Sequence, residues 1–130
     1  MSTSIVLDAS SLIAMIDQEN GGNDVADAIN QSCMCSVNFA EVVTYYAHNG
    51  LSFEQIDNLF RGLPMEIISA DQELSWAAGM LRPETKRAGL SLGDRYCLAL
   101  AKSRKSEVLT ADQKWGEIAD VVQVKMRFIR

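Results

Sequence analysis

The 130-residue chain is 48% hydrophobic and 22% charged, which is enough apolar material for one ordinary domain and excludes a disordered chain. We find no signal-peptide pattern and no run of the roughly 18 apolar residues that a membrane helix needs, so we expect a cytoplasmic protein without a membrane segment. Three cysteines without a framework spacing argue against a disulfide scaffold, and the single histidine, His48, disfavours a structural zinc site.

The net charge of −5 is distributed unevenly along the chain. Residues 1–81 carry eleven acidic side chains and one cation, Arg61, which gives a net charge of −10. Residues 82–130 carry eleven cations and six acidic side chains, a net charge of +5. This asymmetry suggests an anionic partner for the second half, although, taken alone, solvated helix faces are the favoured explanation of the same residues.

Short apolar runs alternate with amphipathic segments, beginning with a β-branched run at residues 5–7. Ser52 and Gln55 have the spacing of a capping box, and Asn38 is expected to cap the helix after the second strand. Residues 82–89 are expected to form a loop around Pro83. The expected strands are 5–7, 33–37, 65–68, 107–110 and, at an edge, 121–124; the expected helices are 10–16, 23–31, 38–50, 52–63, 71–82, 91–104 and 114–119.

Strands that alternate with helices indicate an α/β fold, in which a mostly parallel sheet has helices on both faces. No repeat, low-complexity stretch or linker interrupts this order, so we expect a single domain over residues 1–130. In open parallel sheets, sites form outside the carboxyl ends of the strands. The residues at this edge are therefore the candidates for chemistry.

Four acidic residues fall at this edge. Asp8 directly follows the first expected strand, and Asp112 follows the fourth by two residues. Glu41 lies about one turn into the helix after the second strand, and Asp94 lies in the first turn of the helix that leads into the fourth. The topology predicts that their carboxylates come together.

Each of these acids also has a structural explanation. Asp8 and Asp112 can cap the helices that follow them, Glu41 has a capping-box spacing from Asn38, and Asp94 has a similar neighbour in Ser91. Taken one at a time, capping is the favoured explanation. Taken together, the recurrence of a carboxylate at successive strand ends favours a shared site.

Clustered carboxylates repel one another unless a cation neutralises them, and their oxygen atoms suit Mg²⁺ or Mn²⁺. Such ions can activate water and stabilise the leaving oxygen when a phosphodiester is cleaved. One histidine cannot form a two-histidine ribonuclease or a histidine-based triad, and the chain has neither a P-loop nor a G-x-G-x-x-G motif. These absences leave a metal-dependent carboxylate site as the favoured interpretation.

Four segments resemble, in order and spacing, the four motifs of PIN domains. They are VLDASSLIA at 6–14, SVNFAEV at 36–42, LSLGDRYCLALA at 90–101 and VLTADQKW at 108–115. In chain length and in the amino-acid sequences of these motifs, the chain most resembles the VapC toxins of bacterial type II toxin–antitoxin pairs.

The resemblance implies a three-layer α/β/α sandwich on a parallel sheet of four to five strands. It also implies an endoribonuclease that depends on Mg²⁺ or Mn²⁺, acts as a homodimer and is silenced by a VapB-type antitoxin. Asp8, Glu41, Asp94 and Asp112 match the acidic metal-site positions of the family. Ser10, Asn38 and Thr110 match polar positions that support these acids, whereas Glu117 and Asp120 are not aligned with a further acid that some relatives carry.

The cations of the second half are candidates for contact with the RNA backbone, because phosphate binding depends on lysine and arginine. Arg82, Lys86 and Arg87 form the main candidate cluster, and Arg95 directly follows Asp94. A solvated loop and an ordinary surface ion pair are the competing explanations. Trp76 and Trp115 are expected to pack in the core or between helices rather than to stack on bases.

Two other functions remain to be separated from the ribonuclease. The first is a PIN-like domain without catalysis that binds RNA or protein, although such domains tend to lose the acids that are present here. The second, a phosphotransfer domain, needs an acid paired with Asp8 that the sequence does not supply. An antitoxin helix could lie against Phe53, Leu59 and Phe60, which the core explains equally well.

Overall fold

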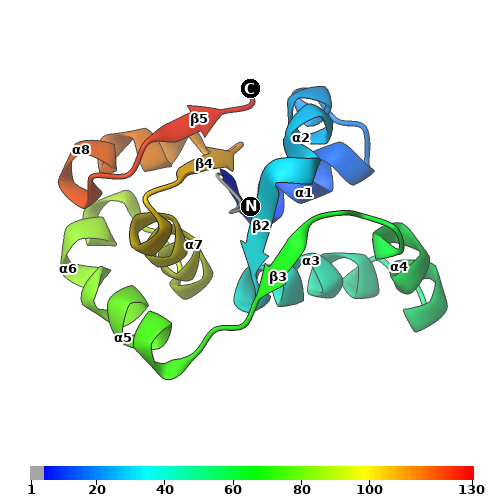
Figure 1. Ribbon diagram of the computed structural model, residues 1–130, viewed down its shortest axis with the longest axis horizontal. Coiled ribbons are helices and arrows are strands. Elements are labelled where there is room, and N and C mark those ends of the chain that lie inside the picture. Colours follow the sequence, from blue (N-terminus) through cyan, green and yellow to red (C-terminus); the bar gives the residue numbers. More distant parts are fainter. Residues whose placement is uncertain (1–4) are drawn as a thin grey trace.

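The computed structural model describes residues 5–130. Its centre is a five-stranded sheet in the order β3-β2-β1-β4-β5, in which all neighbouring strands are parallel (Figure 1). The central strand β1 is entirely buried. The strands are β1 (Ile5–Leu7), β2 (Ser32–Cys35), β3 (Glu66–Ile68), β4 (Glu107–Thr110) and β5 (Met126–Phe128).

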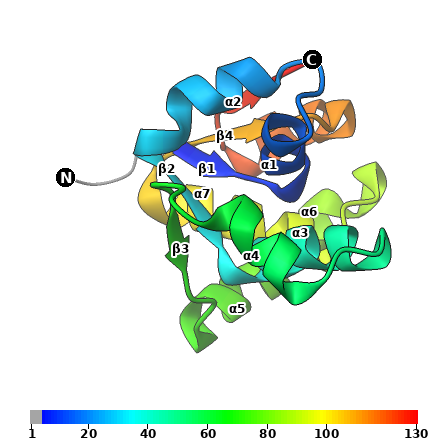
Figure 2. The same cartoon turned by 90° about the vertical axis from the view of Figure 1, so that its right-hand side faces the viewer.

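Helices cover both faces of the sheet, so the expected three-layer sandwich is confirmed (Figure 2). One layer holds α1 (Ala9–Ile16), α2 (Gly22–Ala28), α3 (Ser36–His48) and α4 (Phe53–Phe60). The other layer contains α5 (Gln72–Met80), α6 (Arg82–Thr85), α7 (Leu92–Arg104) and α8 (Ala119–Val122). Three short 3-10 helices, η1 (Ile29–Gln31), η2 (Lys86–Ala88) and η3 (Gln113–Glu117), complete the described chain.

The strand residues alternate between two hydrophobic cores, as the pleat of a β-strand requires. Val6 and Val108 face the core shared with α5, α7 and α8. Leu7 and Leu109 face the core shared with α1 to α4. The sheet is therefore buried on both sides, and only its two edges and the ends of its strands are open to partners.

Two expectations for the second half of the chain are wrong. The fifth strand is not at residues 121–124: Val122 is the last residue of α8 and donates to the carbonyl of Ile118, which precedes this helix, and the edge strand is Met126–Phe128, paired with β4. Val122 and Val124 are buried in the core in either case, so their apolar pattern does not distinguish helix from strand. The expected loop at 82–89 contains α6 and η2, because Pro83 lies in the first turn of α6, where its missing N–H group is not needed.

Two predicted helix starts are also displaced. The capping box of Ser52 and Gln55 is confirmed. In contrast, Asn38 does not cap α3, because this helix begins at Ser36 and Asn38 is buried in its first turn. Likewise, α2 begins at Gly22, one residue before the expected cap Asn23.

The two tryptophans differ in their environments. Trp115 is fully buried, as expected, whereas the packing prediction for Trp76 is wrong, because its side chain on α5 is 67% exposed.

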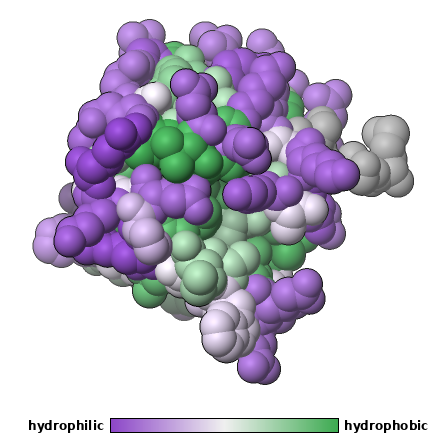
Figure 3. All heavy atoms as spheres, turned by 90° about the vertical axis from the view of Figure 1, so that its left-hand side faces the viewer, coloured by the Kyte–Doolittle hydropathy of each residue, from purple (hydrophilic) through white to green (hydrophobic). Residues whose placement is uncertain are grey.

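The face of the molecule that carries α5, α6 and α8 has apolar surface among its polar side chains (Figure 3). Within residues 5–130, no helix is long and apolar enough to cross a membrane.

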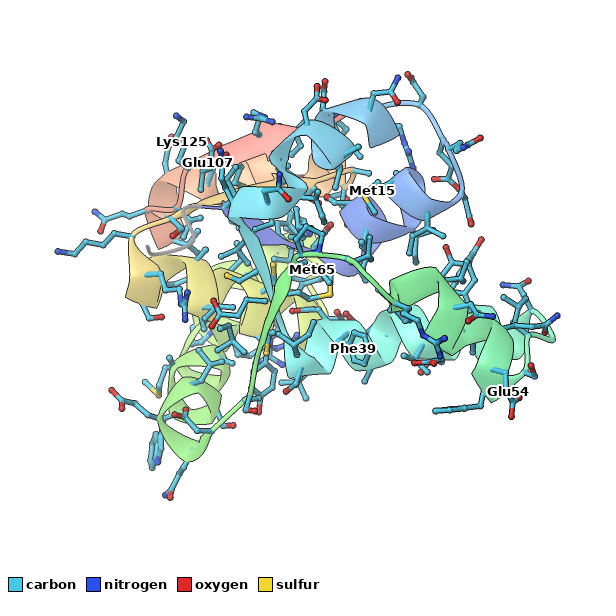
Figure 4. The ribbon with its side chains drawn as sticks, turned by 45° about the vertical axis from the view of Figure 1, so that its right-hand side comes forward. Met15, Phe39, Glu54, Met65, Glu107 and Lys125 are labelled. Atoms are coloured by element: carbon cyan, nitrogen blue, oxygen red, sulfur yellow. The ribbon has the colours of Figure 1, made fainter. Side chains whose placement is uncertain are left out.

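The edge strand β5 is joined to β4 by charged side chains as well as by the backbone. Glu107 of β4 lies 3.4 Å from the Nζ of Lys125 (Figure 4). It also lies 3.4 Å from the Nη1 of Arg127. The two cations are exposed and Glu107 is partly buried, and surface ion pairs of this kind contribute little stability, about 0–1 kcal/mol each. Lys125 and Arg127 nevertheless place positive charge along the β5 edge of the sheet.

Candidate active site

Asp8 lies at the carboxyl end of the central strand β1 and caps α1. Its carboxylate accepts hydrogen bonds from the backbone N–H of Ser11 at 2.8 Å, the hydroxyl of Ser10 at 2.8 Å and the hydroxyl of Thr110 at 2.5 Å. The residue is only 6% exposed. Burial raises the pKa of Asp8 above its usual value, and the three hydrogen bonds oppose this effect without cancelling it. A nearby positive charge would therefore stabilise the ionised form.

The hydroxyls of Ser10 and Thr110 also connect Asp8 to the turn after β4. Ser10 Oγ accepts the N–H of Ala111 at 3.0 Å, and Thr110 Oγ1 accepts the N–H of Asp112 at 3.0 Å. Asp112 in turn caps η3, where its Oδ1 accepts the N–H of Lys114 at 3.0 Å. The structure therefore places the backbone of Asp112 at the same end of the sheet as Asp8, and the hydroxyl of Thr110 links the two residues.

Asp94 lies in the first turn of α7 and forms the expected capping box with Ser91. Its Oδ2 accepts the N–H of Ser91 at 2.9 Å, and its own N–H donates to the hydroxyl of Ser91 at 3.2 Å. Capping thus explains one oxygen of Asp94, just as it explains one oxygen each of Asp8 and Asp112. Capping itself uses one carboxylate oxygen of each acid, and in Asp8 the hydroxyls of Ser10 and Thr110 also donate to the second oxygen.

Helix capping does not explain the position of Glu41. It lies in the second turn of α3, away from the helix start, and its Oε1 accepts an N–H of the Asn38 carboxamide at 2.9 Å. Burial is the largest effect that raises the pKa of Glu41, and the negative charges of Asp94 and Asp8 raise it further. The structure therefore brings Glu41, Asp94 and Asp8 into one like-charged group.

Gly93 and Cys97 belong to this region but were not identified from the sequence. A Cβ atom on Gly93 would lie 2.2 Å from Oε2 of Glu41, so the absence of a side chain is what admits the carboxylate. The available signal was a glycine at the start of a helix, which often marks a close approach. Cys97 is fully buried, and burial together with the charges of Asp8 and Asp94 raises the pKa of its thiol.

The carboxylates do not form a complete metal cage. Among residues 5–130, no group of three or more His, Cys, Asp or Glu side chains is placed to hold a metal ion by itself. Mg²⁺ usually keeps several waters and binds through one or two carboxylates plus phosphate oxygens of the substrate. The oxygen-only donors and the raised pKa values of Asp8 and Glu41 fit this open type of site.

The four candidate RNA-binding cations are in different environments. Arg82, Lys86 and Arg87 are exposed on α6 and η2, and Arg87 donates to the carbonyl of Glu117. Arg95 is partly buried and donates to the carbonyl of Ala78 near the end of α5 at 3.2 Å. The structure thus uses Arg95 to hold α5 against α7, while the other three remain open to solvent.

The residues left outside the site are exposed, as expected for solvated positions. Glu117 lies on η3 and Asp120 on α8, and both side chains face solvent. The three cysteines are buried, and none of them forms a disulfide bond in the part of the chain that the structure describes. Of the four candidate acids, Asp8 and Asp94 both act on the pKa of Glu41, whereas Asp112 is linked to Asp8 through its backbone N–H and the hydroxyl of Thr110.

Comparisons with known proteins agree with this architecture. The chain is similar to a toxin–antitoxin complex from Klebsiella pneumoniae, at 20% identity over 98% of each chain with a TM-score of 0.76. It is also similar to DNA-bound VapBC from Salmonella typhimurium, at 19% identity over 100% of each chain with a TM-score of 0.77. A VapBC-family toxin–antitoxin structure from Mycobacterium tuberculosis is 20% identical, with 96% of this chain and 98% of that chain covered and a TM-score of 0.66.

These identities show a shared fold and no more. No curated protein sequence matches the chain. The family model of the PIN domain matches residues 5–121, which include β1 to β4 and the four candidate acids. The chain belongs to the PIN domain family.

Proposed function

We propose that this protein is a metal-dependent endoribonuclease and the toxin of a type II toxin–antitoxin pair, of the VapC type. PIN domains are in general nucleases. The observation that carries the proposal is the position of Glu41, a half-buried carboxylate beside Asp94 and Asp8 that no helix cap explains. Keeping three like charges together is costly, and a divalent cation removes that cost.

Asp8, Glu41, Asp94 and Asp112 would hold Mg²⁺ or Mn²⁺, either directly or through water. When bound, the ion would supply the positive charge that activates water and stabilises the leaving oxygen of a cleaved RNA phosphodiester. Asp8 is oriented for this role by the hydroxyls of Ser10 and Thr110, and Thr110 also fixes the backbone of Asp112. Asn38 holds one oxygen of Glu41.

The exposed cations Arg82, Lys86 and Arg87 would contact the phosphates of the RNA on either side of the cleaved bond. They lie on α6 and η2, and η2 is joined to η3 by the hydrogen bond from Arg87 to Glu117. Since η3 begins directly after Asp112, this surface continues from the candidate site. Arg95 would act mainly by holding α5, because its guanidinium already donates to that helix.

The proposed protein partner is a VapB-type antitoxin whose helix lies against α1, α3 and α4. Phe53 on α4 is 79% exposed, and Leu59 and Phe60 are only partly buried. Met15, Phe39 and Met65 are further partly buried apolar side chains on α1, on α3 and before β3 (Figure 4). The net charge of −10 over residues 1–81 suits a basic segment of the antitoxin. We propose a homodimer from the family resemblance alone.

The test is cleavage of RNA by purified, antitoxin-free protein with Mg²⁺ or Mn²⁺. We expect cleavage that a chelator abolishes and that Asp8→Asn reduces by about 100-fold or more. Asp120→Asn is the matched control, because Asp120 is an exposed acid outside the site and its loss should leave cleavage unchanged. If the wild-type protein bound RNA or an antitoxin but left total cellular RNA intact with either metal, the chain would instead be a binding module without catalysis.

A further inference from the structure

Asn38 connects the two helices that carry Glu41 and Asp94. Its side-chain nitrogen Nδ2 donates to Oε1 of Glu41 at 2.9 Å and to the backbone carbonyl of Gly93 at 2.9 Å. Asn38 lies one turn before Glu41 in α3, and Gly93 directly precedes Asp94 in α7. Both hydrogens of one amide group therefore join two segments that are 55 residues apart in the chain.

Gly93 provides the second half of the same contact. An added Cβ atom would lie 2.2 Å from Oε2 and 2.6 Å from Cδ of Glu41, much closer than atoms that are not bonded can approach. Glycine is unfavourable inside a helix, so its presence in the first turn of α7 has a local cost. Because residue 93 has no side chain, the carboxylate of Glu41 can lie against the backbone of α7, and this contact offsets the cost of the glycine.

The burial of Asn38 is not explained by packing. The residue is 1% exposed, and its oxygen Oδ1 has no hydrogen-bond partner among residues 5–130. A buried polar atom without a partner lowers stability, and an apolar side chain at this position would avoid the loss. The amide is therefore retained for the two hydrogen bonds that its nitrogen makes.

We propose that Asn38 and Gly93 are positioning residues that together fix the carboxylate of Glu41 and set its separation from Asp94. This inference rests on the proposed function, because it assigns Glu41 and Asp94 to one metal site. Asn38 holds Oε1 from the side of α3, and Gly93 leaves room for Oε2 on the side of α7. A cation that binds both carboxylates then meets a geometry already formed by the fold.

The variants Gly93→Ala and Asn38→Leu test the positioning roles of Gly93 and Asn38 separately. We expect each variant to weaken Mn²⁺ affinity, measured by calorimetry, and to lower kcat for RNA cleavage, both by about 10- to 100-fold, with the KM for RNA unchanged. Gly79→Ala in α5 is the matched control, since within the described residues an added Cβ at Gly79 would meet no atom within 4 Å. It should retain the affinity and the activity of the wild-type protein.

A double-mutant cycle separates positioning from general loss of structure. Glu41→Asp withdraws the carboxylate by one methylene group from the added Cβ, so it should cost less affinity for Mn²⁺ in the Gly93→Ala background than in the wild-type background. Asn38→Leu should keep or raise the thermal stability of the metal-free protein while it loses metal affinity. A merely structural role predicts the opposite result, lower stability with unchanged Mn²⁺ affinity.

The outcomes also distinguish this inference from the proposed function. If the wild-type protein binds Mn²⁺ and cleaves RNA, and the Gly93→Ala and Asn38→Leu variants bind Mn²⁺ and cleave RNA as well as the wild-type protein does, the positioning role is overturned and the proposed function stands. If the wild-type protein neither binds Mn²⁺ nor cleaves RNA, the proposed function fails first, and this inference fails with it.

Discussion

The charged side chains that act on the pKa of Glu41, those of Asp94 and Asp8, are themselves acidic. Burial and the carboxylates of Asp94 and Asp8 raise its pKa, and the hydrogen bond from Asn38 only partly compensates. An acid with a raised pKa in the folded state binds its proton more tightly than in the unfolded chain. Ionised Glu41 therefore destabilises the metal-free protein at neutral pH, and this loss becomes smaller as the pH falls through the folded-state pKa.

Glu41→Gln should raise the melting temperature of the metal-free protein at pH 7 by roughly 1–4 °C, because glutamine keeps the acceptor for Asn38 and removes the charge. The difference should shrink as the pH approaches 4.5, the ordinary pKa of this side chain. Thermal unfolding in chelator at several pH values measures both effects. Saturating Mn²⁺ should reverse the order, since only the wild-type protein gains fully from metal binding.

Glu117→Gln is the control for this experiment, because it removes the same charge from an exposed position on η3. Its melting temperature should stay within about 1 °C of the wild-type value, as is usual for exposed substitutions. A Glu41→Gln variant that melts no higher than Glu117→Gln in chelator would show that the acidic group is not under electrostatic strain.

At the scale of the helix, Asp94 has two roles that can be separated. Its Oδ2 belongs to the capping box of α7, and the charge of the same carboxylate acts on Glu41. Capping alone requires only an acceptor, which asparagine also provides. A metal site requires the negative charge as well.

Asp94→Asn should keep the stability of the metal-free protein and lose Mn²⁺ affinity, whereas Asp94→Ala should lose both. The alanine variant keeps the N-cap Ser91 but removes the acceptor for the N–H of Ser91, which should cost about 1 kcal/mol in the free energy of unfolding. Denaturant unfolding and calorimetry with Mn²⁺ measure the two quantities independently. Unchanged Mn²⁺ affinity in Asp94→Asn would leave Asp94 with a capping role alone.

The elements that the sequence predicts well are those with strong local signals. The run Ile5 to Leu7, the capping box of α4 and the order of strands and helices up to α5 were all predictable, because pattern and caps act over a few residues. The contact of Gly93 with Glu41 was not, because it depends on how α3 and α7 pack across 52 residues of chain. The exposure of Trp76 and the place of β5 also depend on such packing.

The uneven charge of the sequence becomes an uneven distribution over the molecule. Helices α1 to α4, from the acidic part of the chain, lie on one side in Figure 1, and α6, α7 and α8, with β5, lie on the other, where α5 is the one helix from the acidic part. Asp8, at the end of the central strand β1, lies between them. A negatively charged strand of RNA is repelled by the first side, so it should approach the acids across α6 and η2.

The dependence of RNA affinity on salt tests this direction of approach. Arg82→Gln and Lys86→Gln, each in an Asp8→Asn background that leaves RNA intact, should weaken binding similarly for different sequences and lower the salt slope by about one each. Arg61→Gln is the matched control, because Arg61 is exposed on the acidic side and paired with Asp57. Equal slopes for all three variants would place the RNA elsewhere, whereas a slope reduced only by the first two would place its phosphates over α6 and η2.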